Sequence, residues 1–183
     1  MAFTLENHGF PPDEIRRRSK ETLAKVHLDG LEERKVSTLS GGQCQRLVVA
    51  AVLAEEPEVL VFDEPTSALD PEGIREFYEM VGELNRKEGL TVIVAEHHLE
   101  AALPYAKKFI LMNQGKIISQ GTPEEVMRAM KQNHIYEEAI PDMYRAQLTL
   151  EDQGISFEKP FLNIKDAQQS VMDSFEKGEG KHA

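Results

Sequence analysis

The sequence predicts an α/β fold with a mainly parallel sheet, and two observations support this. Two short apolar runs rich in β-branched residues, Val59–Phe62 and Thr91–Ala95, have the composition of strands buried on both faces of a parallel sheet. Between them, from about Pro71 to Arg86, lies a helical segment. Two parallel strands joined by a helix form a β-α-β unit, which is expected to cross over right-handedly.

Two helices are predicted before this unit. The first begins at Pro11–Glu14, where proline and acidic residues suit a first turn, and continues to about Val26 with a thin apolar stripe of Ile15, Leu23 and Val26. The second is capped by Ser40 and ends before Pro57. Its packed positions are predicted to be Leu47, Val48, Ala51 and Val52.

After the β-α-β unit the sequence predicts a hairpin, short helices and a tail. The hairpin pairs 107–112 with 116–120, and a short helix starts at Pro123. Two further helices are expected over Asp142–Asp152 and over 166–175, and the tail Gly178–Ala183 has the composition of a disordered segment.

The bulk composition excludes several classes of protein. With 21 Lys and Arg against 32 Asp and Glu, the 183-residue chain carries a net charge of −11, which argues against a nucleic acid partner. The single cysteine, Cys44, rules out an internal disulfide and fits a reducing, cytoplasmic location. No apolar stretch approaches the roughly 18 residues of a membrane-spanning helix, so service to a membrane would be from its surface.

Reactive side chains follow both predicted strands. Asp63 and Glu64 follow the first run and His97 follows the second, so parallel pairing would place them on one edge of the sheet. Asp63 suits a Mg²⁺ site completed by water and phosphate oxygens. Glu64 could act as general base on an attacking water, and His97 could hold the γ-phosphate or that water. Each residue alone also has an ordinary structural explanation, such as a helix cap.

The segment Ser40–Gln43 changes that balance. Gly41 and Gly42 at a helix start expose backbone N–H groups at the positive end of the helix dipole, which is an anion site. Glycine there costs helix stability, roughly 1 kcal/mol per residue relative to alanine. A bound phosphate would explain why the glycines are present.

Together these residues resemble the ATP-binding subunit of ATP-binding cassette (ABC) transporters, a P-loop NTPase family. Leu39–Gln43 matches the family's signature motif, Val59–Glu64 its Walker B strand, Ser67-Ala68-Leu69-Asp70 its D-loop, and His97 its switch histidine. A narrower resemblance, to the energy-coupling factor ATPases that power uptake of cobalt, nickel or vitamins, rests on Phe3, Leu5-Glu6-Asn7, Pro11–Ile15, Glu96–Glu100 and a C-terminal module with Pro141, Gly154 and Pro160.

The resemblance implies cofactors, partners and a location. Two such subunits sandwich ATP with Mg²⁺, and Ser40, Gly41, Gly42 and Gln43 would face the nucleotide of the second ABC ATPase subunit, while Asp63, Glu64 and His97 serve the chain's own site. The pair would act on the cytoplasmic face of the membrane, as a peripheral component. Its other partners would be a transmembrane energy-coupling component and a substrate-binding membrane subunit.

One part of the family pattern is missing from the sequence. There is no G-x-x-x-x-G-K-S/T loop. Gly115-Lys116 is a Gly-Lys pair, but the apolar residue Ile117 follows it where the loop requires serine or threonine. The sequence therefore resembles the C-terminal portion of the domain. We expect a partial ATPase domain over residues 1–132, with a helical signature subdomain at 1–56 and a Walker B core at 57–132. Residues 133–183 would form a C-terminal appendage, whose helices either cover the core or, as the resemblance implies, mediate dimerisation.

Two alternatives remain beside an ATPase of an importer. In the first, the chain is a degenerate subunit that lends its signature loop to a full-length partner and hydrolyses nothing itself. In the second, it is a soluble ABC-type ATPase of DNA repair or translation, which the absence of a heptad run and of net positive charge disfavours. Because it lacks the phosphate loop, the isolated chain is predicted to show no ATPase activity. A core without the first strands of the domain is also predicted to expose apolar surface.

Overall fold

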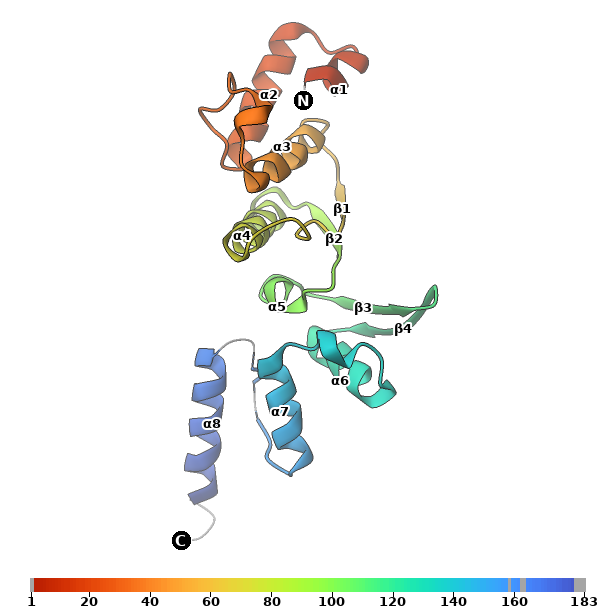
Figure 1. Cartoon of the computed structure of the whole chain (residues 1–183), viewed down its shortest axis with the longest axis vertical. Helices are drawn as coiled ribbons and strands as arrows, with labels where there is room; N and C mark the ends of the chain where they lie inside the picture. Colours follow the sequence, from red (N-terminus) through yellow and green to blue (C-terminus); the bar gives the residue numbers. More distant parts are fainter. Residues whose placement is uncertain (1, 158, 162–163, 180–183) are drawn as a thin grey trace. The chain divides into compact units, whose positions relative to one another are not determined.

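The computed structural model describes residues 2–157, 159–161 and 164–179, and the chain forms two compact units, Met1–Glu96 (unit 1) and His97–Ala183 (unit 2). Figure 1 labels their elements. Unit 1 contains α1 (Ala2–Asn7), α2 (Pro12–Lys25), η1 (Val36–Thr38), α3 (Gly41–Leu53), β1 (Val59–Asp63), α4 (Pro71–Glu88) and β2 (Thr91–Ala95). Unit 2 contains α5 (Leu99–Ala102), β3 (Phe109–Asn113), β4 (Lys116–Gly121), α6 (Pro123–Asn133), η2 (Glu137–Ala139), α7 (Asp142–Asp152) and α8 (Ile164–Glu179).

An arginine of α2 holds α2 against the end of α3. The predicted stripe of α2, Ile15, Leu23 and Val26, is buried. From the same helix, Arg18 lies 4.5 Å from the centre of the Phe10 ring and donates to the carbonyl of Ala54 at the end of α3, at 3.1 Å. A cation at a helix C-terminus also interacts favourably with the helix dipole, so Arg18 stabilises the α2–α3 contact in two ways and, in addition, packs on Phe10, which precedes α2.

Helix α3 begins where the sequence predicts, but it buries a different face. Val49 and Leu53 are buried, whereas Val48 and Val52, which were predicted to pack, are 60% and 44% exposed. The predicted face is therefore wrong. From Leu47 to Ala54 every residue is apolar, so periodicity could not select one side of this helix.

The β-α-β unit is confirmed. β1 and β2 pair in parallel, with Val59 opposite Thr91 and Asp63 opposite Ala95. Helix α4 begins with Pro71 after an Asp70 cap and ends at Gly89, whose φ of +71° suits glycine.

Only one face of this two-stranded sheet is covered. Leu60 is buried, and the Phe62 ring packs edge-on against Phe77 of α4 with 5.3 Å between the ring centres. On the other face Val61 is 70% exposed and Ile93 52% exposed. The expectation that both strands are buried on both faces is wrong, because within unit 1 helix α4 packs against one face and the sequence composition does not distinguish one covered face from two.

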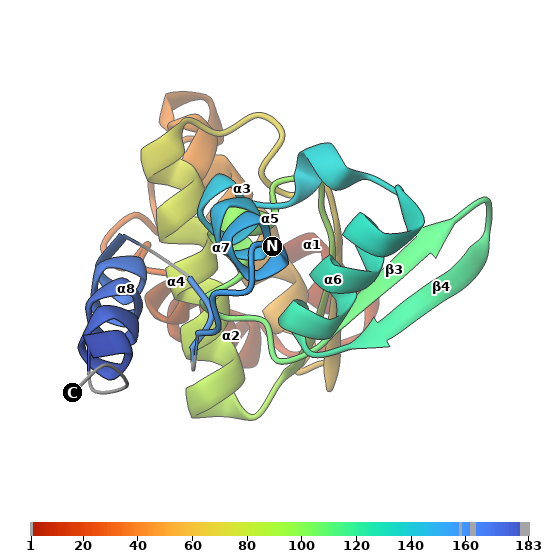
Figure 2. The same ribbon diagram turned by 90° about the horizontal axis from the view of Figure 1, so that it is seen from below.

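Unit 2 is built on an antiparallel hairpin. β3 and β4 pair as predicted, with a register shift between Leu111 and Met112, and Gln114 and Gly115 form the turn with φ values of 49° and 73°. Helix α6 lies along this hairpin (Figure 2) and buries Val126 and Met127 in a cluster shared with α7. The predicted helices at 123, 142–152 and 166–175 are present as α6, α7 and α8.

A reciprocal cap starts α6 directly after β4. The Thr122 hydroxyl accepts from the Glu125 N–H at 3.2 Å, and the Glu125 carboxylate accepts from the Thr122 N–H at 2.8 Å. A Cβ on the preceding Gly121 would lie 2.2 Å from that carboxylate. The cap therefore occupies the space that a side chain at position 121 would need.

At the C-terminal end, a buried glutamine connects α7 to the segment before α8. The Gln147 side chain is buried, accepts from the Phe161 N–H at 2.7 Å and donates to Glu151 at 2.7 Å. The predicted disorder of Gly178–Ala183 falls mainly on residues outside those described, and Gly178 and Glu179 belong to α8. The domain boundary predicted after residue 132 remains a prediction.

Candidate functional site

The start of α3 presents a capped but open helix end. The Ser40 hydroxyl accepts from the Gln43 N–H at 3.2 Å, and the Gln43 side-chain oxygen accepts from the Ser40 N–H at 3.0 Å. This capping box uses two of the donors at the helix start. Among the described residues, no acceptor from the chain is seen for the N–H groups of Gly41 and Gly42.

The two glycines are not required by packing within the chain. A Cβ placed on Gly41 or Gly42 would have no atom within 4 Å, and neither residue has a positive φ. Neither steric crowding nor an unusual backbone conformation therefore explains glycine here. Close approach of an external anion to the free N–H groups would explain it.

The second group of candidate residues lies at the carboxyl end of β1. Asp63 and Glu64 are both exposed, and the Glu64 N–H donates to the carbonyl of Ala95 at the end of β2, at 3.0 Å. Glu64 has a φ of +44°, a conformation that residues other than glycine adopt rarely and at an energetic cost. Such strain is often found at functional positions.

The D-loop residues lead from this strand end into α4. Ser67 and Ala68 are exposed, and the Asp70 carboxylate accepts from the Gly73 N–H at 2.7 Å. Asp70 therefore has a structural role as the helix cap, beside any role in a nucleotide site.

Sequence analysis missed a buried cluster beneath these loops. The Thr66 hydroxyl donates to Glu96 Oε2 at 2.6 Å, and the Tyr78 hydroxyl donates to the same oxygen at 3.3 Å. Burial raises the pKa of Tyr78, and the Glu96 charge raises it further. The three residues come from separate segments of the chain, so no local sequence pattern indicates that they meet.

His97 is the first residue of unit 2. Its side chain is exposed, and its carbonyl accepts from the Leu99 N–H at 3.2 Å. Thus Asp63, Glu64 and Ser67–Asp70 follow one another at one strand end of unit 1, while the predicted cooperation of His97 with Glu64 remains a prediction.

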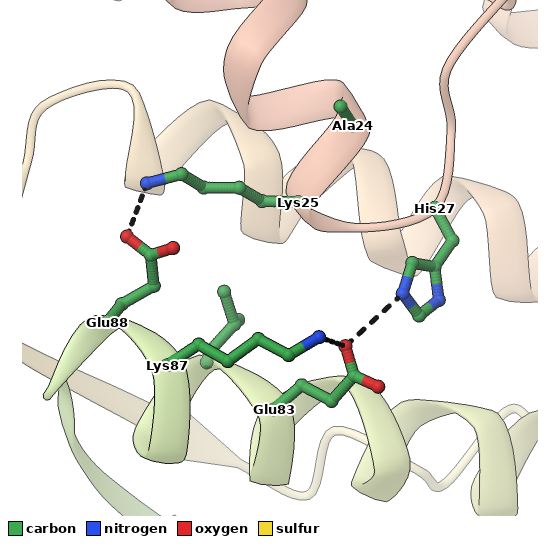
Figure 3. Close-up of a pocket in the computed structure, with 7 residues that line it drawn as sticks. Ala24, Lys25, His27, Glu83, Lys87 and Glu88 are labelled. Atoms are coloured by element: carbon green, nitrogen blue, oxygen red, sulfur yellow. Dashed lines mark hydrogen bonds and ion pairs between the residues drawn. The ribbon is translucent and has the colours of Figure 1, made fainter.

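A shallow pocket lies away from all of these residues, between the end of α2 and α4 (Figure 3). Lys25 pairs with Glu88 at 2.5 Å, Lys87 with Glu83 at 2.8 Å, and His27 Nε2 lies 3.6 Å from Glu83. The Lys87 hydrogen bond lowers the pKa of Glu83. The charged groups that line the pocket pair with one another, and the pair between Lys25 and Glu88 connects α2 to α4.

The described residues also bear on metal and membrane association. In the described ranges, no three His, Cys, Asp or Glu side chains gather in a way that could hold a metal ion. None of the helices described is both long and apolar enough to cross a bilayer.

Comparison with known proteins identifies similar ATPases. Residues 2–67 match the family described as "ABC transporter". The chain is 37% identical to the energy-coupling factor transporter ATP-binding protein EcfA1 of Clostridium novyi (strain NT) over 90% of the chain and 58% of that relative. It is also 37% identical to EcfA2 of a Bacillus cereus strain, over 97% of the chain and 61% of that relative.

Solved structures show the same likeness. The cbiO1 protein from Clostridium perfringens, part of the ABC transporter complex cbiONQ, is 34% identical with a TM-score of 0.63, over 72% of the chain and 55% of that protein. The ADP conformation of MJ1267, an ATP-binding cassette of an ABC transporter, is 27% identical with a TM-score of 0.63, over 73% of the chain and 52% of that protein. The chain spans about six tenths of the length of the curated relatives it matches.

Proposed function

Because the chain belongs to the ABC transporter ATPase family, we propose that it forms part of the ATP-binding subunit of an energy-coupling factor importer. ATP hydrolysis by such a subunit would drive uptake of a metal ion or a vitamin. Its similarity to energy-coupling factor transporter ATP-binding proteins and to cbiO1 supports this class of importer. We place the subunit at the cytoplasmic face of the membrane, with a transmembrane energy-coupling component and a substrate-binding membrane subunit as partners.

The observation that carries the proposal is the open start of α3. Ser40 and Gln43 cap the helix, and the space that a Cβ would take at Gly41 and Gly42 is open, so a phosphate could approach their backbone N–H groups. We assign Ser40, Gly41, Gly42 and Gln43 to the phosphates of ATP held by a second ABC ATPase subunit. The helix dipole and the hydroxyl would stabilise charge on the γ-phosphate as the reaction proceeds.

The strand end supplies the other half of the chemistry. Asp63 would hold Mg²⁺, whose charge neutralises phosphate oxygens, and the exposed Glu64 carboxylate would accept the proton of the attacking water. His97 would hold the γ-phosphate or that water in line, and Ser67-Ala68-Leu69-Asp70 would lie at the contact between subunits. The isolated chain contains no G-x-x-x-x-G-K-S/T loop, so we predict no turnover above background from it alone.

A trans-complementation assay tests the proposal. The chain is mixed with a full-length energy-coupling factor ATPase subunit whose own signature loop has been disabled, so that this partner's ATP site depends on the signature loop of our chain. We expect the mixture to hydrolyse ATP. Gly41→Asp should lower the rate by on the order of a hundredfold, because it places a carboxylate where the phosphate is expected.

The same substitution should leave the fold intact. A Cβ at position 41 meets no atom, and an acidic residue in a first helical turn is favoured by the dipole. Gly41→Ala is the matched control, because it adds a Cβ without charge. Equal turnover in the Gly41→Asp and Gly41→Ala mixtures would contradict the proposed contact with phosphate.

Glu64→Gln separates the two forms of the proposal in a second assembly, in which the chain is joined to the phosphate-loop portion of a relative and paired with a subunit whose signature loop is intact. If the chain contributes its own catalytic base, the substitution lowers the rate of this second assembly. If the chain only lends its signature loop, as in the degenerate-subunit alternative, the rate is unchanged.

A further inference from the structure

Two hydrogen bonds tie the ends of β1 and β2 together, one from the backbone and one from side chains. The Glu64 N–H donates to the Ala95 carbonyl at 3.0 Å. Two residues after Glu64, the Thr66 hydroxyl donates to Glu96, the residue after Ala95, at 2.6 Å. The strained residue Glu64 is therefore bracketed by contacts to the neighbouring strand.

The side-chain contact is buried and charge-assisted. Thr66 is 1% exposed and Tyr78 2% exposed, and both hydroxyls donate to the same oxygen of the half-buried Glu96. Burying a carboxylate is costly unless donors satisfy it, and a hydroxyl donating to a carboxylate forms one of the stronger hydrogen bonds in proteins. Removing Thr66 would take one of the two hydroxyl donors from Glu96, and removing Glu96 would take this acceptor from both hydroxyls.

The backbone around Glu64 needs such support. Its φ of +44° is unfavourable for a residue with a Cβ, and conformations of this kind persist only where surrounding contacts determine them. The contacts continue on the C-terminal side, where the Glu64 carbonyl accepts from the Ser67 N–H at 3.3 Å. Because φ sets the direction in which the Cα–Cβ bond leaves the backbone, the same contacts determine where the Glu64 carboxylate lies.

We propose that Glu96, held by Thr66 and Tyr78, is a positioning residue that keeps Glu64 in its left-handed backbone conformation. It acts through the Thr66 hydroxyl and the backbone of the loop, without contacting a reacting atom. The proposal rests on the proposed function only in giving the Glu64 carboxylate a catalytic use. Its structural core, the tie between the two strand ends, holds independently of any activity.

Amide hydrogen exchange on the full 183-residue chain, followed by mass spectrometry, tests the tie. The readout is the exchange rate of the segment 64–69, and the segment 41–53 of α3, in the same unit, serves as an internal reference. Thr66→Val keeps the shape of the side chain but removes the donor, and it should speed exchange of 64–69 by roughly tenfold or more. Thr66→Ser keeps the donor but removes the methyl group, and it should preserve the protection.

Comparing Thr66→Val with Thr66→Ser separates the effect of hydrogen bonding from the effect of packing. If Thr66 acts only through its methyl group, the serine variant exchanges fast and the valine variant exchanges slowly, and the proposal is overturned. If Thr66→Val also deprotects α3, unit 1 has lost its fold as a whole, and the pair Glu96→Ala and Glu96→Gln decides instead. The glutamine retains an acceptor oxygen and should protect 64–69, whereas the alanine should not; equal protection in both variants overturns the proposal.

A kinetic readout distinguishes positioning from simple stabilisation. In the second assembly described above, whose ATP site includes Glu64, Thr66→Val should lower kcat at an unchanged KM for ATP, and Thr66→Ser should restore it. A parental kcat in Thr66→Val, with fast exchange of 64–69, overturns the positioning role. Conversely, if the exchange results hold while the parental mixture shows no turnover, the tie stands and the proposed function fails.

Discussion

The positive φ of Glu64 predicts a reversal of the usual order of stability between alanine and glycine. At a φ of +44°, a residue with a Cβ is strained by about 1–2 kcal/mol, and glycine is not. Glycine loses roughly 0.5–1 kcal/mol more conformational entropy on folding. The two effects together predict that Glu64→Gly is more stable than Glu64→Ala by about 0.5–1 kcal/mol. Comparing these two variants removes the contribution of the Glu64 carboxylate from both.

Glu79 provides the matched control in the same unit. It is an exposed residue inside α4, and it does not have a positive φ. There Gly should be less stable than Ala by about 1 kcal/mol, because glycine is a poor helix former. The four variants are compared by urea denaturation followed by far-ultraviolet circular dichroism, using shifts in the transition midpoint. If glycine destabilises position 64 as it does position 79, Glu64 does not have the left-handed conformation in solution.

Two further predictions concern the α2–α3 contact. Arg18→Ala removes the hydrogen bond to the Ala54 carbonyl and the contact with the Phe10 ring, and it should lower the free energy of unfolding by about 2 kcal/mol in urea titrations; a loss below about 0.5 kcal/mol would contradict this. Hydrogen bonds from Arg17, then Arg18, lower the pKa of Glu14 from its ordinary 4.5 to about 2. The depressed pKa means that its contribution is fully present above about pH 4.5 and is lost as the pH falls toward 2. Glu14→Gln should therefore flatten this part of the acid stability profile, and a profile parallel to the parent's would show that the ion pairs do not stabilise the fold.

Local sequence signals predicted the elements of the fold well. The apolar runs at Val59–Phe62 and Thr91–Ala95 correctly predicted paired parallel strands, since β-branched and aromatic residues bounded by proline and glycine are typical of strands. Ser40 was correctly predicted to cap α3, and the structure shows that its side chain and that of Gln43 form the two hydrogen bonds of a capping box. In each case the determining interactions lie within a few residues of one another.

Which face an element buries was much harder to predict. Helix α3 is apolar on most sides over Leu47–Ala54, and the strand residue Val61 has the composition of a core residue although it is exposed. Burial of such positions depends on which neighbours pack against them, and that information is distributed over the whole fold. Sequence pattern alone therefore identified the elements but not their faces.

The candidate site divides in the same way. Ser40–Gln43, Asp63, Glu64 and His97 could be singled out because each lies in a short motif or directly after a strand. The hydrogen bonds of Thr66 and Tyr78 to Glu96 could not be predicted in this way. These three residues are brought together only by the pairing of β1 with β2 and the packing of α4.

The cap of α6 makes the effect of one mutation depend on another. Position 121 has no conformational need for glycine, since its φ is not positive, and only the Glu125 carboxylate occupies the space of a Cβ there. An alanine at 121 would displace that carboxylate and break its bond to the Thr122 N–H, yet in a chain that already lacks Glu125 the same alanine would meet no such obstacle. Substitutions at 121 and 125 are thus expected to be epistatic: either one breaks the cap when it comes first, and the other then adds little further cost.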